Sequence, residues 1–241
     1  MPGQEDLSPS RDGGFGQSGL RVEELAWGVP APPRTYWAAR AAVVAAIALY
    51  LALPDQLIPG PRFIVPSLEG IVLLALSFVV PHRTTVDHPA RRTLAIALIG
   101  TISVTNTISL GLLISHLLHG GVQQGRALIF SSIAIWLTNV IVFALWYWEF
   151  DRGGPIRRSA GVSRHPDLMF PQMASPQLAS PDWEPHFVDY LYLSFTNATA
   201  FSPTDVMPLA RWAKVTMAVQ SAVSLGVGAL VIARAVNILR T

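Results

Sequence analysis

Long apolar blocks without a polar face are the feature that most limits what this chain can fold into. They cover residues 37–53, 63–80, 94–118, 127–150 and 209–239. Their apolar residues follow neither the alternation of a half-buried strand nor the periodicity of an amphipathic helix. In lipid a helix satisfies its own backbone hydrogen bonds and needs no polar face. Since about 20 apolar residues cross a bilayer, the sequence predicts an all-α, polytopic transmembrane protein with about five spans.

The composition supports this class and excludes others. Hydrophobic residues make up 51% of the chain and charged residues only 13%, whereas a soluble domain carries about 25% charged residues. There are no cysteines, which excludes disulfides, thiolate catalysis and cysteine-based metal sites. The arginines lie beside the apolar blocks, as in membrane proteins, so we expect no nucleic-acid partner. We find no enzyme signature and expect no catalytic residue, cofactor or metal.

Four regions follow from these patterns. Residues 1–34 are rich in Gly, Pro, Ser and acidic residues, which predicts a disordered N-terminal tail. Residues 35–150 form a four-span helical membrane region. Residues 151–186 are polar and proline-rich and predict a surface strap. Residues 187–241 combine a short, pore-like helix with the final transmembrane helix.

The segment 187–201 is only partly apolar and too short to cross a bilayer as a helix. Two interpretations stay open. It is either a re-entrant helix that dips into the membrane and turns back, or an interfacial helix with a purely structural role. In the second case Ser202, Thr204 or Asp205 acts as a capping residue.

The stretch from Phe195 to Pro208 (FTNATAFSPTDVMP) resembles the pore helix and filter of the potassium-channel superfamily. The filter glycines of that family are replaced here by Ser202 and Thr204, so the resemblance implies a channel that is not potassium-selective. It implies a homo-oligomer, a tetramer by analogy, that passes small ions. The candidate pore-lining residues are Thr196, Thr199, Ser202, Thr204 and Asp205.

A second resemblance covers residues 144–155, 182–205 and 233–239. These segments resemble an uncharacterised bacterial, actinobacterial-type family of multi-pass membrane proteins of unknown function. The resemblance implies a place in the lipid bilayer of the bacterial plasma (inner) membrane and brings no known activity. The alternative to a channel is a non-conducting structural or partner-binding membrane protein.

Polar residues inside the apolar blocks are further candidates. Asn106 and Asn139 predict hydrogen bonds between helices or, alternatively, the wall of a transport path. Glu69 follows a proline at the start of the second block, and we expect it at the membrane surface. Within hydrocarbon it would be a functional candidate.

The distribution of arginine predicts the orientation. Most arginines lie in the N-terminal tail and in the segments that follow the second and fourth blocks, so the N-terminus is expected in the cytoplasm. With five spans the C-terminus then lies outside, opposite to its place in potassium channels. A miscounted span, such as the short second block, would remove this conflict.

Overall fold

The computed structural model describes residues 36–79, 89–119, 125–161, 165–180, 183–200 and 205–238. The predicted N-terminal tail lies outside these residues, as do Ser202 and Thr204. The described chain is mostly helical. Its main helices are α2 (Trp37–Leu51), α3 (Ile64–Val79), α4 (Pro89–His119), α5 (Gly125–Phe150), α8 (Phe187–Ala200) and α9 (Arg211–Ile238).

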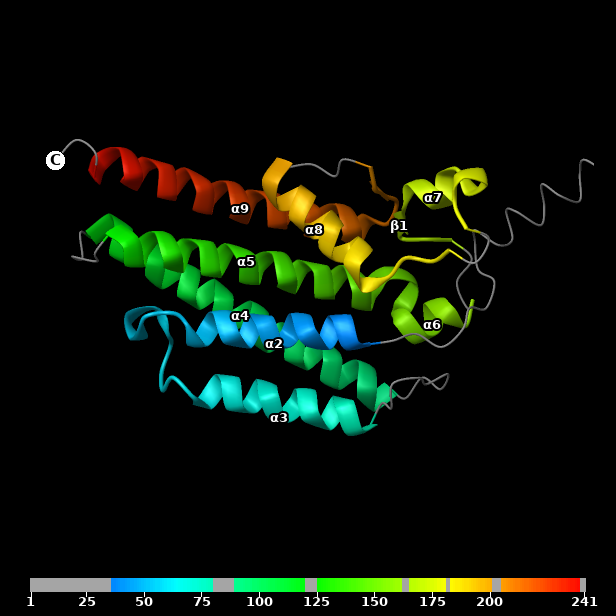
Figure 1. The fold of residues 1–241 in the computed structure, drawn as a ribbon, viewed down its shortest axis with the longest axis horizontal. Coiled ribbons are helices and arrows are strands. Elements are labelled where there is room, and N and C mark those ends of the chain that lie inside the picture. Colours follow the sequence, from blue (N-terminus) through cyan, green and yellow to red (C-terminus); the bar gives the residue numbers. More distant parts are fainter. Residues whose placement is uncertain are drawn as a thin grey trace, which may run out of the picture.

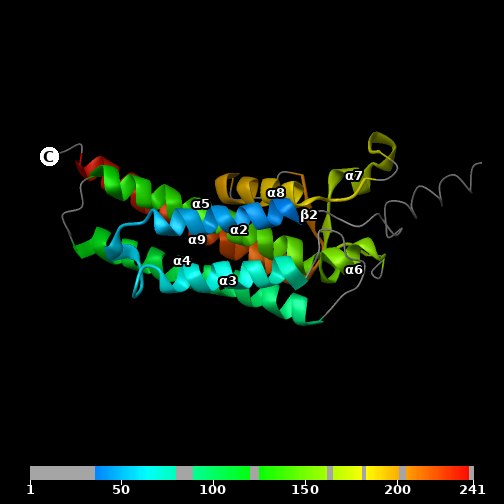
Figure 2. The ribbon, with the colours of Figure 1, turned by 60° about the horizontal axis from the view of Figure 1, so that its bottom comes forward.

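Helices α2, α3, α4, α5 and α9 lie side by side along the long axis of the molecule (Figures 1 and 2). Helix α5 is central and packs against α2, α4, α8 and α9. One end of the bundle carries α6 (Pro155–Ser159) and strand β1 (Leu168–Met169), and we call it the charged end. The other end carries the loop between α2 and α3, and we call it the loop end.

Two of the described helices are long and apolar enough to cross a membrane, within residues Pro89–Leu117 and Ala127–Gly153. This is fewer than the five spans that the sequence predicts. Helices α2 and α3 have only 15 and 16 residues, which is about 22–24 Å of helix against about 30 Å of hydrocarbon. Prolines between residues 54 and 66 separate them, and Pro54 stops α2 early.

Helix α9 is long enough, with 28 residues, but its first half is less apolar than the cores of α4 and α5. It begins with Arg211 and Lys214, and Gln220 follows in its third turn. From residue 230 on, α9 lies outside the part of the chain whose side chains the structure describes, so the count of two covers only the first part of this helix.

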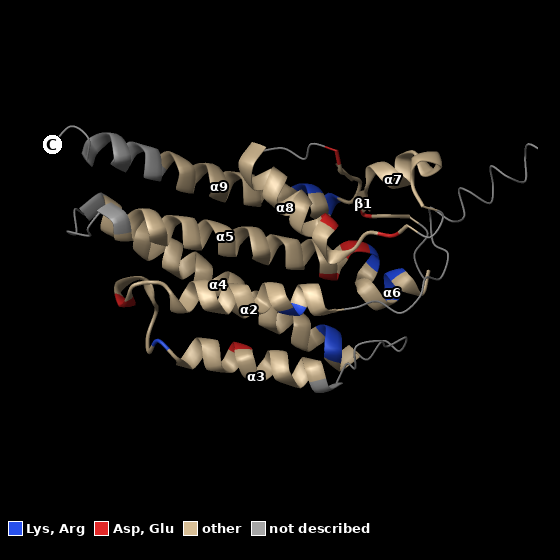
Figure 3. Ribbon diagram, in the orientation of Figure 1, with Lys and Arg blue, Asp and Glu red and all other residues tan. Residues whose placement is uncertain are grey.

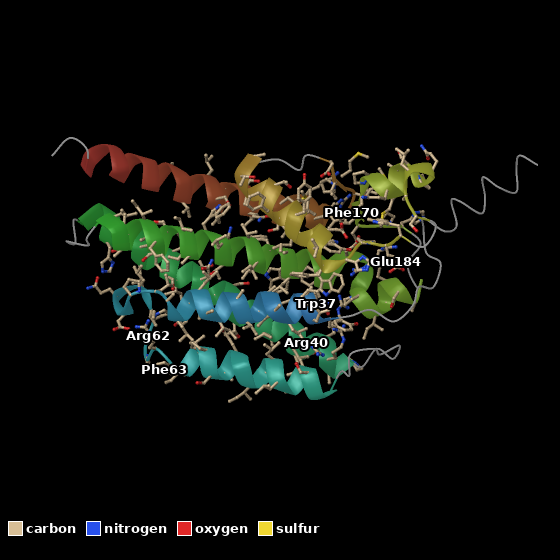
Figure 4. The ribbon with its side chains drawn as sticks, in the orientation of Figure 1. Trp37, Arg40, Arg62, Phe63, Phe170 and Glu184 are labelled. Atoms are coloured by element: carbon tan, nitrogen blue, oxygen red, sulfur yellow. The ribbon has the colours of Figure 1, made fainter. Side chains whose placement is uncertain are left out.

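The charged residues gather at one end. Figure 3 shows that most of the described Lys, Arg, Asp and Glu residues lie near α6, β1 and the start of α9, while few charged residues lie on the ribbon between the two ends. At the loop end Arg62 binds Asp55 at 2.7 Å, and Figure 4 shows Arg62 and Phe63 together there. The bundle therefore has a long waist with few charged residues, and one of its two ends carries most of the described charged residues of both signs.

The segment after α5 folds against the charged end. It contains the one-turn helix η2 (Asp151–Gly153), α6, β1, α7 (Pro171–Ala174) and η3 (Pro176–Leu178). Strand β1 pairs antiparallel with β2 (Met207–Pro208), with Leu168 opposite Pro208. Leu168 and Phe170 are buried in the main apolar core. Where the sequence predicts a surface strap, the described residues also supply core side chains.

A sharp turn makes this return possible. Gly153 and Gly154 have φ angles of 80° and 104°, in the region that only glycine adopts without strain. A Cβ on Gly154 would lie 3.1 Å from the Glu149 carbonyl oxygen. The Gly153–Gly154 pair therefore ends α5 and turns the chain into α6.

Candidate functional site

Helix α8 is the short helix that the sequence predicts over 187–201. It has 14 residues, or about 21 Å of helix, and cannot cross the hydrocarbon of a bilayer. It starts at the charged end, runs along α5 and α9 toward the middle of the bundle, and the chain comes back to β2 at the charged end (Figures 1 and 2). Entry and return therefore lie at the same end.

One face of α8 is buried against α5 and α9. Tyr190, Leu193, Ser194 and Asn197 form this face, with the spacing of neighbours along a helix. The opposite face exposes the side chains of Val188, Tyr192 and Phe195. The buried face of α8 thus contains polar residues, whereas its exposed face presents mainly apolar and aromatic side chains.

The structure describes three of the predicted pore-lining residues, Thr196, Thr199 and Asp205, and does not bring these three together around one point. Thr196 is buried, and its hydroxyl donates to the carbonyls of Tyr192 and Leu193, both at 3.0 Å. Thr199 is exposed, and its hydroxyl donates to the Phe195 carbonyl at 2.9 Å. Asp205 is exposed at the charged end. Ser202 and Thr204 lie outside the described residues.

The interior instead holds a hydrogen-bonded network around Gln220 of α9. The Gln220 amide nitrogen donates to the Ser194 carbonyl and hydroxyl, at 2.9 and 2.7 Å. Its amide oxygen accepts from the Tyr147 hydroxyl at 2.8 Å and from the Asn197 amide at 2.9 Å. The Ser194 hydroxyl donates onward to the Val140 carbonyl at 2.7 Å.

This network joins three helices in the driest part of the bundle. Tyr147, Ser194 and Gln220 have no exposed surface, so each unpaired polar group would bear its full desolvation cost. Every polar side-chain atom of Gln220 is paired. The network therefore fixes how α8 is placed between α5 and α9.

The sequence analysis missed this network. Two features of the sequence could have indicated it. The first is the polar residue Gln220 inside the last apolar block, comparable to Asn106 and Asn139 in theirs. The second is the spacing of Ser194 and Asn197, which places both on one face of a helix. Asn106 itself donates from α4 to the Ile135 carbonyl of α5 at 3.4 Å, which agrees with its predicted role between helices.

A second polar cluster closes the charged end. The Asp151 carboxylate accepts from the Tyr190 hydroxyl at 2.6 Å and from the backbone amide of Asp167 at 3.1 Å. Arg158 lies 3.7 Å from the same carboxylate and over the ring of Trp148, 4.7 Å from its centroid. Buried charges need such pairing. The cluster ties α5, α6, β1 and α8 together.

A buried ion pair joins α4 to α5 nearby. Arg91 lies 3.2 Å from the Glu149 carboxylate, and both side chains are almost fully buried. A cavity of about 80 Å³ borders this pair and is otherwise lined mostly by apolar side chains of α2, α3, α4 and α5. Arg40, labelled in Figure 4, lies at its edge. Arg91 precedes the apolar block that begins at residue 94, but it lies within α4, which begins at Pro89.

Helix α9 turns its small residues outward. Its buried face is formed by Ala213, Met217, Gln220, Ser224 and Val227. Ala218, Ala222 and Gly226, spaced four apart, are exposed. A Cβ on Gly226 would meet nothing within 4 Å. This small-residue stripe does not pack within the chain.

Over the described ranges, no three His, Cys, Asp or Glu side chains come together in a way that could hold a metal ion. Together, fold and site define a mostly helical bundle with two helices of membrane-crossing size and a half-length helix beside them. Comparison of the chain with protein families, curated proteins and solved structures gave no match.

Proposed function

We propose that this chain is a multi-pass membrane protein of the bacterial plasma membrane and that α8 is a re-entrant helix. Several copies, four by analogy, assemble into a channel-like pore beside α8 and α9 and pass small ions without potassium selectivity. The observation that carries the proposal is the path of α8, which leaves the charged end, stops short of the loop end and returns. A helix of this length in lipid is a re-entrant or interfacial element.

The proposal includes more crossing segments than the two that length and hydropathy identify. Helices α2 and α3 lie parallel to α4 and α5 in the same bundle and expose apolar side chains such as Val44, Leu68 and Leu74. Short helices cross where the bilayer thins or their ends reach the interface. On this basis α2, α3, α4, α5 and α9 are the five crossing helices.

The charged end is proposed to face the cytoplasm. It holds the arginines of α2, α4 and α6 together with Arg211 and Lys214 of α9. The loop end holds fewer: Arg62, Arg126 at the start of α5 and Arg234 near the end of α9. An excess of Lys and Arg marks the cytoplasmic side. The N-terminus and both ends of the α8 segment are then cytoplasmic, and α9 ends outside.

The outward stripe of α9 supports the assembly. Ala218, Ala222 and Gly226 would let two helices approach closely, which is how small residues act between helices in membranes. Val215 and Val219 flank the stripe and are exposed. A second copy of the chain would cover this face and bring the outer side of α8 close to a shared axis.

A second function is favoured by a different observation. The buried polar groups of α8 are used in hydrogen bonds within the chain, and the Thr196 hydroxyl is bound to its own helix. A protein that uses α8 only as a structural wedge would have this pattern. The alternative is therefore a non-conducting membrane protein that serves as a scaffold or binds a partner.

The experiment compares cation flux into liposomes that hold the wild type, Gly226→Leu or Gly111→Leu. Both glycines are exposed on helices with open space around them, so neither leucine should disturb the fold of one chain. We expect flux from the wild type and Gly111→Leu, and at least tenfold less from Gly226→Leu. Asp205→Asn should lower cation flux without changing the oligomer.

Two results would reject the channel. One is the absence of flux under any cation gradient from reconstituted wild type. The other is a monomer in detergent and in lipid nanodiscs, because one α8 cannot enclose a pore. Either result favours the scaffold, which predicts equal behaviour of Gly226→Leu and Gly111→Leu.

A further inference from the structure

Glu69 lies in the interior of the bundle, where the sequence analysis did not place it. It is in the second turn of α3, and its side chain is 3% exposed. No described residue forms a salt bridge or hydrogen bond with its carboxylate. An ionised carboxylate held away from water without a partner is costly, and in a membrane protein it marks a functional site.

The carboxylate borders a small polar cavity between α2, α3, α4 and α5. The cavity measures about 10 Å³ and is lined by Glu69 and by the oxygen-bearing side chains of Tyr50, Thr105, Asn106 and Thr138. A cavity of about 10–15 Å³ holds one water-sized body. The apolar lining residues are Ala46, Leu53 and Ile102.

Tyr50 supplies an independent observation. Its side chain is 6% exposed, and its hydroxyl has no hydrogen-bond partner among the described residues. A buried hydroxyl usually finds a partner. Tyr50 is on α2 and Glu69 on α3, so two helices each contribute a residue with an unpaired oxygen group to the lining of the same cavity.

The other polar residues can contribute oxygen lone pairs. Asn106 uses its amide nitrogen for the Ile135 carbonyl, which leaves its amide oxygen as an acceptor. Thr105 and Thr138 donate their hydroxyl protons to carbonyls of their own helices, which leaves lone pairs on both oxygens. The cavity thus offers one negative charge and four neutral oxygen groups.

We propose that Glu69, Tyr50 and Asn106 form the binding site for one small monovalent cation of the Na⁺ class. Oxygen ligands suit hard cations, and a single carboxylate is neutralised by a single positive charge, whereas a divalent ion would leave a buried net charge. A proton alone would neutralise the carboxylate, but the single O–H of the resulting carboxyl group can donate to only one of the neutral oxygens, whereas a bound cation is coordinated by several of them at once. The site belongs to one chain and does not depend on the proposed pore.

The test measures the melting temperature of the purified protein in detergent. NaCl, KCl and choline chloride are compared at constant ionic strength, for the wild type, Glu69→Gln, Tyr50→Phe and Asp55→Asn. Asp55 is the matched control because it is an exposed carboxylate near the same end of the bundle. Gly226→Leu is included because it should prevent assembly of the chains while each single chain still contains the whole proposed site.

We expect Na⁺ to raise the melting temperature of the wild type in a saturable way, by about 5–10 °C at one hundred times the dissociation constant. K⁺ and choline should raise it less. Glu69→Gln should lose the Na⁺ effect, and Tyr50→Phe should need about 3–10 times more Na⁺ for half the effect. Asp55→Asn and Gly226→Leu should keep it.

Three outcomes would overturn the proposal. The first is equal stabilisation by Na⁺, K⁺ and choline, which would be an effect of ionic strength. The second is an undiminished Na⁺ effect in Glu69→Gln. The third is stabilisation of the wild type by lower pH but not by Na⁺, which would mean that Glu69 takes only a proton. If Glu69→Gln does not fold, the comparison of salts on the wild type and Tyr50→Phe decides.

Discussion

At the scale of single residues, the interior of this bundle contains many polar side chains, and most of them are paired. Gln220 connects Tyr147 of α5 with Ser194 and Asn197 of α8. Arg91 is paired with Glu149, and Asp151 with Tyr190 and Arg158. In a low dielectric an unpaired member of such a set costs more than the pair gains. Stability should therefore depend strongly on these few residues.

Replacing Gln220 with leucine should lower the free energy of unfolding by about 2 kcal/mol, because Ser194, Asn197 and Tyr147 lose partners together. Tyr147→Phe removes one donor and should cost about 1 kcal/mol. Denaturation in mixed detergent micelles measures both. Val219→Leu, on the exposed face of the same helix, is the control and should be close to neutral. A Gln220→Leu protein as stable as this control would show that the network does not hold α8.

Replacing Asp151 with alanine should cost about 3–5 kcal/mol, because Arg152 and Arg158 stay buried beside it without their anion. Tyr190→Phe removes only the hydrogen bond to this carboxylate and should cost about 1.5–3 kcal/mol. Asp55→Asn breaks an exposed ion pair and should cost less than about 1 kcal/mol. The same unfolding assay ranks the three. Equal costs for Asp151→Ala and Asp55→Asn would contradict the role of the cluster.

At the scale of helices, the five apolar blocks predict the existence and order of α2, α3, α4, α5 and α9, and the partly apolar segment 187–201 predicts α8, whereas the ends of the helices are predicted less well. Helix α4 begins at Pro89, a residue suited to the first turn, although the block begins at residue 94. The residues between Pro89 and the start of the block are mostly polar and include Arg91, yet they are part of the helix. Arg91 is stabilised there by an ion pair with Glu149, which lies 58 residues later in the sequence. Such a partner cannot be found from local sequence.

The buried face of α8 could not be predicted from local sequence either. Apolar and hydroxyl-bearing residues are mixed around the whole helix, so their pattern does not show which face is buried. Thr196 and Thr199 donate to carbonyls of their own helix, as threonines in helices commonly do. Ser194 and Asn197 are the residues that turn inward. The sequence motif predicts where the short helix lies, but which of its polar residues form contacts with other helices is determined by tertiary packing.

The turn after α5 gives a prediction at this scale. Gly154→Ala would place a Cβ against the Glu149 carbonyl at a φ of 104°, and should lower the free energy of unfolding by about 1–3 kcal/mol. Gly100→Ala, in α4 with open space around it, should cause no loss because alanine favours a helix. Thermal unfolding of both variants checks this. A neutral Gly154→Ala would mean that the chain can leave α5 by another turn.

At the scale of the whole molecule, the bundle has a charged end, an apolar waist and a loop end with one described ion pair. Helices α2, α4 and α9 run from the charged end to the loop end, and α3 and α5 run back. Helix α8 is the exception because it turns back within the waist. The proposed orientation, the proposed pore and the position of the C-terminus all depend on this return.

Cysteine labelling tests this return directly, because the chain contains no cysteine of its own. Leu178 before α8, Leu209 after it, and Asp55 at the loop end are all exposed and can each be replaced by cysteine. With a membrane-impermeant maleimide, the account predicts that positions 178 and 209 react from the same side of the membrane and position 55 from the other. Labelling of 178 and 209 from opposite sides would show that the 187–205 segment crosses, and would contradict the account.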